Sequence, residues 1–251
     1  MKIYYEPTQF NKKLAQVAKE RLPGSHEFHP LSKYGAFRRH WQLKRIKEPA
    51  VFIWGSGWNH HESYYFTSNK VKAKVNIDQH SDDLAYSKGE RVRGVTCVNH
   101  VAMTAKLGVE TLSIVSSRMN NVQIPENFSS DKMALSVDFD CIPFFPASPI
   151  WALMDEKGGY RLETIVKFID DSKPRIRMLD MGGVANSVPD FIVDNKIRAP
   201  KSSDISEFCD KLKTKQPMNK NTANVVLNYA LDVYLRVLEA FVKDEKQTNI
   251  A

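Results

Sequence analysis

The sequence predicts an α/β fold in three layers, in which helices cover both faces of a mostly parallel central sheet. Two observations support this prediction. Short runs of β-branched and aromatic residues alternate along the chain with longer runs whose apolar residues recur at helical spacing. Polar clusters follow several of the β-type runs, as expected where ligands bind beyond the carboxyl ends of parallel strands.

Six β-type runs are expected to form the sheet. The second is closed by the glycine-rich turn Gly55-Ser56-Gly57. The third alternates apolar and polar residues and delivers Asp78, the fifth delivers Asp138, and the sixth delivers Asp180. The runs are residues 3–5, 50–54, 71–77, 111–115, 133–137 and 175–179.

Five segments are expected to be helical. The first ends at Pro23-Gly24, a pair that commonly ends a helix. The last repeats apolar residues at helical spacing but is interrupted by charged side chains, so it is a packed helix with Thr222 as its expected N-terminal cap. Residues 25–48 are polar, aromatic and basic and give no clear assignment. The helical segments are residues 10–21, 95–107, 162–169, 208–212 and 223–242.

Length and composition are those of an ordinary folded protein. Of the 251 residues, 42% are hydrophobic and 26% are charged, and no internal repeat or low-complexity linker is present. Residues 1–251 are therefore expected to form a single domain. No run reaches the ~18 apolar residues of a membrane span, and the N-terminus lacks the apolar stretch of a signal peptide. A cytoplasmic location without membrane association is expected.

The charge balance and the cysteine content limit the kinds of partner and of covalent cross-link that are expected. The net charge of +7 favours a negatively charged partner at encounter, although the basic residues are spread along the chain, as on an ordinary solvated surface. No zinc-finger or aromatic RNA-binding motif is present, so no nucleic-acid partner is expected. The odd cysteine count, without a Cys-x-x-Cys pair, suggests no disulfide framework. Association into a homo-oligomer is left open.

Two acidic clusters point to a metal site. Asp78, His80 and Asp82 alternate after one β-type run, and Asp138 and Asp140 alternate after another, so each set lies on one side of an extended chain. A histidine after the glycine-rich turn, His60 or His61, would complete the shell. Imidazole and carboxylate ligands suit Mn²⁺ best, with Fe, Co or Zn as alternatives. The expected metal ligands are His60, Asp78, His80, Asp82, Asp138 and Asp140.

The order of these clusters resembles the ureohydrolase superfamily (arginase, agmatinase and relatives), which is related to the metal-dependent deacetylases. That family carries Gly-Gly-Asp-His, then Asp-x-His-x-Asp, then Ser-x-Asp-x-Asp-x-x-Asp-Pro. The corresponding segments here are Gly57-Trp58-Asn59-His60, Asp78-Gln79-His80-Ser81-Asp82 and Ser136-Val137-Asp138-Phe139-Asp140-Cys141-Ile142-Pro143. The resemblance spans about residues 50–240. It implies an arginase/deacetylase-like fold, two Mn²⁺ ions on the six ligands, and proton transfer to the leaving amine by Asp82.

Further residues are candidates for proton transfer and substrate binding. Asn99-His100 is similar to the Gly-Asn-x-His segment of the family, which makes His100 the acid/base candidate, with a helix-surface histidine as the alternative. A guanidinium group needs a carboxylate partner. Each carboxylate candidate could instead be a helix cap or a surface ion pair, and the sequence does not rank them. The expected substrate-binding residues are Glu62, Asp83, Asn99 and Asp180.

Departures from the arginase pattern concern the substrate. Pro143 replaces the third aspartate of the last motif, and Gly183 stands where arginases have the glutamate that holds the guanidinium. No counterpart exists for the residues that bind the amino-acid end of free arginine. The chain is therefore most similar to the small, divergent arginase-like family that includes peptide arginases. The implied partner is a precursor peptide of a ribosomal natural-product pathway, whose arginine side chains become ornithine with release of urea.

Three other functions stay open. The first is a metal-dependent amide hydrolase of the deacetylase type, and the second is action on another small guanidino compound. The third is a non-catalytic binding protein that keeps the fold.

Overall fold

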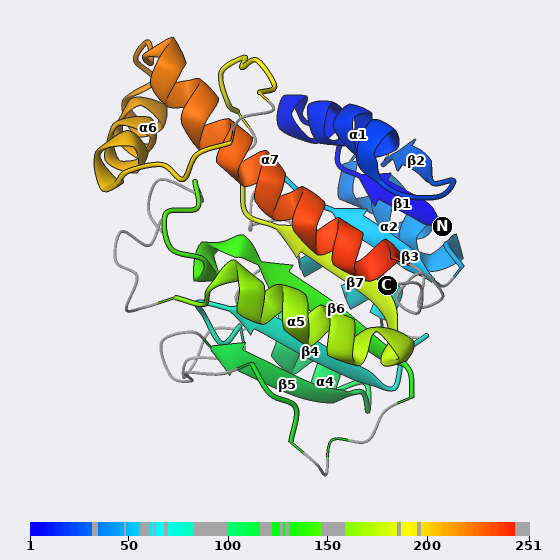
Figure 1. Cartoon of the computed structure of the whole chain (residues 1–251). Coiled ribbons are helices and arrows are strands. Elements are labelled where there is room, and N and C mark those ends of the chain that lie inside the picture. The colour runs from blue at the N-terminus through cyan, green and yellow to red at the C-terminus, as the bar shows by residue number, and fades with distance from the viewer. Residues whose placement is uncertain are drawn as a thin grey trace, which may run out of the picture.

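A single parallel sheet organises the computed structural model of the chain (Figure 1). The structure describes residues 1–31, 35–47, 49–55, 61–62, 64–67, 70–82, 100–115, 122–125, 128, 131–146, 159–184, 187–194 and 197–243. Within these residues the sheet has seven strands in the order β2-β1-β3-β7-β6-β4-β5, and every neighbouring pair is parallel. The strands are β1 (Lys2–Tyr5), β2 (Glu27–Pro30), β3 (Ala50–Ile53), β4 (Ala73–Asp78), β5 (Glu110–Val115), β6 (Met133–Asp138) and β7 (Ile176–Gly182).

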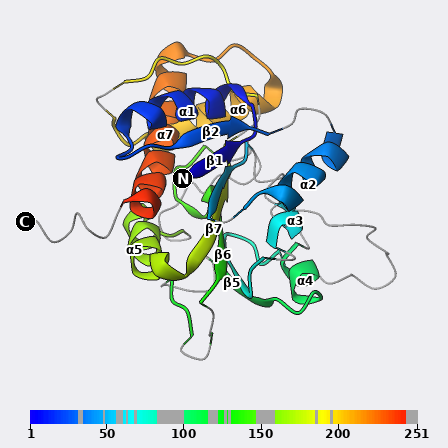
Figure 2. The ribbon, with the colours of Figure 1, turned by 90° about the vertical axis from the view of Figure 1, so that its right-hand side faces the viewer.

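Helices cover both faces of the sheet, which confirms the predicted three layers (Figures 1 and 2). One face carries α1 (Gln9–Arg21), α5 (Leu162–Ser172) and α7 (Lys220–Val242), and α6 (Ser202–Thr214) packs against α7. The other face carries α2 (Gly35–Arg45), α3 (Tyr64–Thr67) and α4 (His100–Ala105). None of the described helices combines the length and the apolarity that crossing a bilayer requires.

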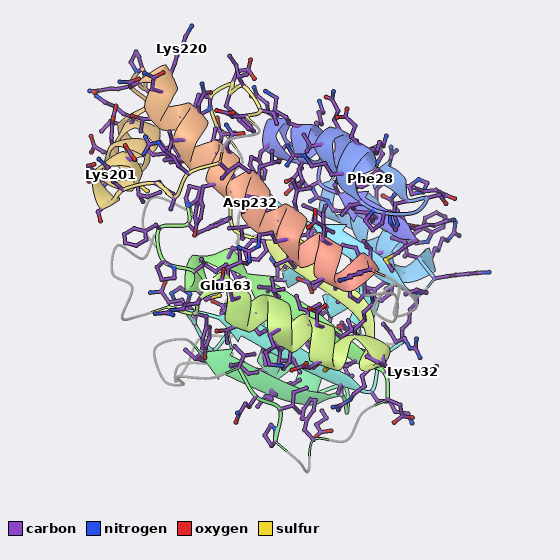
Figure 3. All side chains as sticks on the ribbon, in the orientation of Figure 1. Phe28, Lys132, Glu163, Lys201, Lys220 and Asp232 are labelled. Atoms are coloured by element: carbon purple, nitrogen blue, oxygen red, sulfur yellow. The ribbon has the colours of Figure 1, made fainter. Side chains whose placement is uncertain are left out.

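Alternation along the central strands produces a separate apolar core on each face. Val51 and Ile53 of β3 belong to the core shared with α1, α5 and α7. Ala50 and Phe52 of the same strand belong to a smaller core on the face of α2 and α3. Because both faces are covered, every residue of β3 is buried. Lys220 at the start of α7 is exposed and projects away from the molecule (Figure 3).

Several elements differ from the sequence prediction. The unassigned segment 25–48 contains β2 and α2, and α6 begins earlier than the predicted residues 208–212. Thr222 is not the cap of α7. Asn219 caps this helix by accepting a hydrogen bond from the backbone N–H of Asn221, while the hydroxyl of Thr222 donates to Glu207. The prediction for residues 95–107 is described only from His100, where α4 begins. Among the described cysteines, Cys141 and Cys209 are free.

Candidate active site

The predicted acidic clusters meet at the carboxyl ends of β4 and β6, which are neighbours in the sheet (Figure 1). Asp78 is the last residue of β4, and Asp138 is the last residue of β6. A short 3-10 helix, Phe139–Cys141, begins directly after β6. The carboxylate of Asp138 caps it by accepting from the backbone N–H of Asp140 at 3.2 Å. This cap turns the Asp140 side chain back toward β4.

Asp78, His80 and Asp140 form a compact group of side chains able to hold a metal ion. One ligand atom of each lies within 4.8 Å of the others. The Nδ1 atom of His80 is 3.3 Å from Asp78 Oδ1 and 3.2 Å from Asp140 Oδ2. The two carboxylates are buried, whereas the His80 side chain is 40% exposed, so the group borders solvent on one side. Two carboxylates and an imidazole form a ligand set that suits Mn²⁺ and similar divalent ions.

Hydrogen bonds of its backbone groups hold the loop after β4 beside these side chains. The N–H of His80 donates to Asp78 Oδ1 at 2.8 Å, and the N–H of Gln79 donates to Asp140 Oδ1 at 3.3 Å. Ser113 of β5 donates its hydroxyl hydrogen to the carbonyl oxygen of Ser81. These bonds orient the carboxylates and the loop independently of any ion.

The close approach of buried, charged side chains raises the pKa values of His80 and Asp140. Hydrogen bonds to Asp140 and Asp78 raise the pKa of His80 to about 10. Burial, together with the charge of Asp78, raises the pKa of Asp140 to about 7, although His80 opposes this. The metal-free group therefore keeps a proton on His80 at neutral pH, which compensates part of its negative charge.

Metal binding is expected to release protons and to strengthen as pH rises. The proton on His80 competes with a metal ion for the imidazole, because a ligating histidine must be neutral. The apparent affinity for Mn²⁺ should rise about tenfold per pH unit for each displaced proton between about pH 6 and pH 8, below the raised pKa of His80. Calorimetry in buffers of different ionisation enthalpy measures the number of protons released. An affinity that does not change with pH would contradict this prediction.

Asp82 and His100 form a second, adjacent pair. The Nε2 atom of His100 lies 2.9 Å from Asp82 Oδ2, and the backbone N–H of Val101 donates to the carbonyl oxygen of Asp82. Asp82 adopts a positive φ of 48°. His100 is fully buried, so the alternative of a helix-surface histidine is wrong. His60, Asp83 and Asn99 lie outside the described residues.

A buried polar layer supports the site from within the sheet, and sequence reasoning missed most of it. Val75 and Ile77 face the larger core, so Lys74, Asn76 and Asp78 face the side of α4. Asn76 is in register with Ser136 of β6. Lys74 Nζ lies 2.7 Å from His100 Nδ1. The sequence does carry a signal for this layer, since Lys74 and Asn76 alternate with apolar residues in a central parallel strand. Such strands are buried on both faces, so their polar side chains must be paired inside the protein.

Asp180 does not follow its strand as predicted. The ladder continues for two further residues, with Met181 opposite Val137 and Gly182 opposite Asp138, so Asp180 lies inside β7. It is fully buried and accepts a hydrogen bond from Ser136 Oγ at 2.8 Å. This carboxylate is part of the polar layer beneath the strand ends.

Glu62 is paired with a guanidinium group of the chain itself. Arg39 Nη1 lies 3.1 Å from Glu62 Oε1 and 3.3 Å from Glu6 Oε1. Glu6 Oε2 also accepts from the backbone N–H of Gly55, so the cluster joins the ends of β1 and β3. Burial raises the pKa of Glu62 to about 7, against the attraction of Arg39, and the charge of Glu6 adds to the rise.

This raised pKa predicts a pH-dependent stability that depends on Glu62. A carboxyl group with a higher pKa in the folded state than in the unfolded chain stabilises the fold when protonated, and this contribution is lost as pH rises through about 7. The loss amounts to roughly 3 kcal/mol for a pKa that rises from 4.5 to about 7. Glu62→Gln should remove this part of the decline in unfolding free energy between about pH 5 and pH 8. Urea denaturation at each pH measures it, with the exposed Glu163→Gln as the control. An unchanged decline would contradict the prediction.

Gly183 directly follows β7 at a crowded position, where an added side chain would force its neighbours to shift. Its φ is +140°, and a Cβ atom there would lie 3.1 Å from the Phe145 ring, 3.2 Å from Phe139 Cβ and 3.3 Å from Asp138 Oδ1. Phe139 and Phe145 are fully buried and contact each other and Tyr234 of α7. The backbone of Gly183 therefore packs directly behind Asp138.

The architecture is similar to that of several solved structures, although the sequence has no match. No protein-family model matches the sequence, and no curated protein sequence matches it. Among solved structures, proclavaminate amidino hydrolase from Streptomyces clavuligerus aligns with a TM-score of 0.55 at 12% identity, over 96% of this chain and 90% of that one. Agmatine ureohydrolase of Thermoplasma volcanium aligns with a TM-score of 0.53 at 12% identity, over 97% and 91%. Entamoeba histolytica arginase, in complex with L-ornithine, aligns with a TM-score of 0.53 at 10% identity, over 97% and 98%.

The chain has the ureohydrolase fold. In this fold, the candidate metal group Asp78, His80 and Asp140 lies at the carboxyl edge of the sheet. The Asp82–His100 pair lies beside it, because Asp82 follows the same strand.

Proposed function

We propose that this chain is a metal-dependent hydrolase that cleaves a guanidino C–N bond. We infer further that its substrate is an arginine side chain within a precursor peptide, which becomes ornithine as urea is released. The observation that carries the proposal is the convergence of Asp78, His80 and Asp140 at the strand ends of a ureohydrolase fold.

The donor set fits a divalent metal. Asp78, His80 and Asp140 would hold one Mn²⁺ ion, and Asp138, Asp82 and His60 would complete a pair of sites. Bound divalent metals lower the pKa of a water molecule toward neutrality, which supplies a nucleophile. Water then adds to the guanidino carbon, and the bond to the side-chain nitrogen breaks as that nitrogen gains a proton. The products are urea and the amine of ornithine.

Asp82 and His100 are suited to carry the proton to the leaving amine. They are in hydrogen-bond contact at 2.9 Å, and the imidazole is fully enclosed. A histidine in contact with a site carboxylate is a common arrangement for acid/base catalysis. Their place beside the metal-binding group is what this role requires.

The preference for a peptide rests on the lack, in the sequence, of a counterpart to the residues that bind the amino-acid end of free arginine. Gly183 also stands where the arginase pattern has the glutamate that holds the guanidinium. The similar structures are named for proclavaminate, agmatine and arginine, so the fold alone does not select a substrate. An arginine inside a peptide has no free amino-acid end to be recognised. The net charge of +7 favours encounter with an acidic peptide.

A substrate panel tests this proposal. The protein, loaded with Mn²⁺, is incubated with free arginine, with arginine blocked at both ends, and with an arginine-containing peptide. Urea and the peptide mass are measured, and the same peptide with lysine in place of arginine is the control. Urea from the blocked arginine and the peptide, but not from free arginine, is expected. Urea from free arginine alone would overturn the peptide substrate, and deacetylation of an acylated peptide without urea would favour the amide-hydrolase alternative.

A further inference from the structure

Lys74 is a fully buried lysine near the start of the central strand β4. Lysine is almost never fully buried unless its ammonium group is paired. Its neighbours in sequence, Ala73 and Val75, belong to the larger core, so the Lys74 side chain faces α4 on the other side of the sheet. The position therefore calls for a role beyond filling space.

The ammonium group of Lys74 contacts the acid/base candidate. Its Nζ atom lies 2.7 Å from His100 Nδ1, while the opposite ring nitrogen, Nε2, lies 2.9 Å from Asp82 Oδ2. The Asp82 carboxylate accepts, so the ring hydrogen is on Nε2, and Nδ1 of the neutral ring then accepts from an N–H of Lys74. The imidazole is thus held between a donor and an acceptor, with its N–H directed at Asp82.

Burial has the larger effect on Lys74 and lowers its pKa, whereas the carboxylates of Asp180, Asp82 and Asp78 oppose this effect in part. The side-chain carboxylates of Asp82 and Asp78 are also expected to contact the metal, so Lys74 lies on the protein side of the same charge cluster. Ligands and catalytic histidines are commonly oriented by such a third group.

We propose that Lys74 is a positioning residue that holds His100 with its Nε2 hydrogen directed toward Asp82. In this orientation the Nε2 hydrogen of His100 faces Asp82, the residue proposed to pass a proton to the leaving amine. Without Lys74, the ring loses the donor that faces its Nδ1 atom, and its orientation is less firmly held.

Two variants of similar shape separate this role from simple packing. Lys74→Met fills the space without a donor, and Lys74→Gln keeps an N–H donor without a charge. Nitrogen-15 NMR of the histidine rings measures whether His100 Nδ1 accepts a hydrogen bond. Zn²⁺ replaces the paramagnetic Mn²⁺ in these samples. The His100→Asn variant assigns the His100 signal. We expect the His100 Nδ1 resonance to move downfield, toward an unbonded ring nitrogen, in Lys74→Met and to stay near its original position in Lys74→Gln. An unchanged resonance in a folded Lys74→Met variant would overturn the proposal.

A kinetic measurement rests on the proposed function and complements the NMR. Lys74→Met should lower kcat about 10–100-fold with little change in KM, because Lys74 supports a catalytic group without contacting the substrate. Lys74→Gln should recover part of that loss. Equal losses in both variants, or a change in KM alone, would count against positioning. If the NMR shift is seen but no substrate yields urea, the Lys74 contact stands and the proposed function fails.

Discussion

Asp78→Ala is expected to abolish both metal binding and turnover. Asp78 provides one of the atoms grouped within 4.8 Å, and its carboxylate also accepts the backbone N–H of His80. The change therefore removes a ligand and frees the loop that presents a second one. Changes at groups that only support metal ligands cost about 10–100-fold in affinity or activity, so the loss of a ligand should cost at least about 100-fold.

Metal content and urea release are measured on the same preparation. Asp171→Ala is the matched control, because this aspartate is exposed on α5 and pairs only with Lys167 among the contacts described for it. The control should bind metal and turn over normally. A folded Asp78→Ala variant that keeps its metal and its activity would show that the site lies elsewhere.

Gly183→Ala should destabilise the protein by about 1–3 kcal/mol through backbone strain alone, with a further loss from crowding. The added Cβ would lie 3.1 Å from the Phe145 ring, 3.2 Å from Phe139 Cβ and 3.3 Å from Asp138 Oδ1, so these buried groups would have to shift. The same displacement should weaken metal binding, since Asp138 caps the turn that carries Asp140.

Gly108→Ala is the control for strain without crowding. Gly108 also has a positive φ, +79°, but a Cβ atom added there would have no other atom within 4 Å. Denaturant unfolding and metal titration compare the two variants. Equal stability losses with unchanged metal affinity would contradict the claim that Gly183 packs behind the metal site.

The sequence predicted the sheet and its acidic edge because both depend on short-range patterns. Alternation within single strands located Asp78 and Asp138, and parallel strands bring their carboxyl ends to one edge. His80 lies close to Asp140 because β4 and β6, which precede the two clusters, are paired in the sheet.

The remaining features depend on contacts between distant segments. Arg39 joins Glu6 and Glu62 across the ends of two strands, and α2, which carries Arg39, had no recognisable pattern. The contact between Lys74 and His100 spans a strand and a helix. Asp180 was misplaced because the extra strand residues, Met181 and Gly182, are fixed by pairing with β6 and not by local propensity.

The most direct test of the central claim is the source of the oxygen in the urea. The Mn²⁺-loaded protein is incubated with an arginine-containing peptide in water enriched in heavy oxygen, and both products are analysed by mass spectrometry. We expect labelled urea together with a peptide that contains ornithine, and neither product after the metal is removed with a chelator. Absence of urea, or undiminished turnover in the metal-free protein, would contradict metal-dependent guanidino hydrolysis.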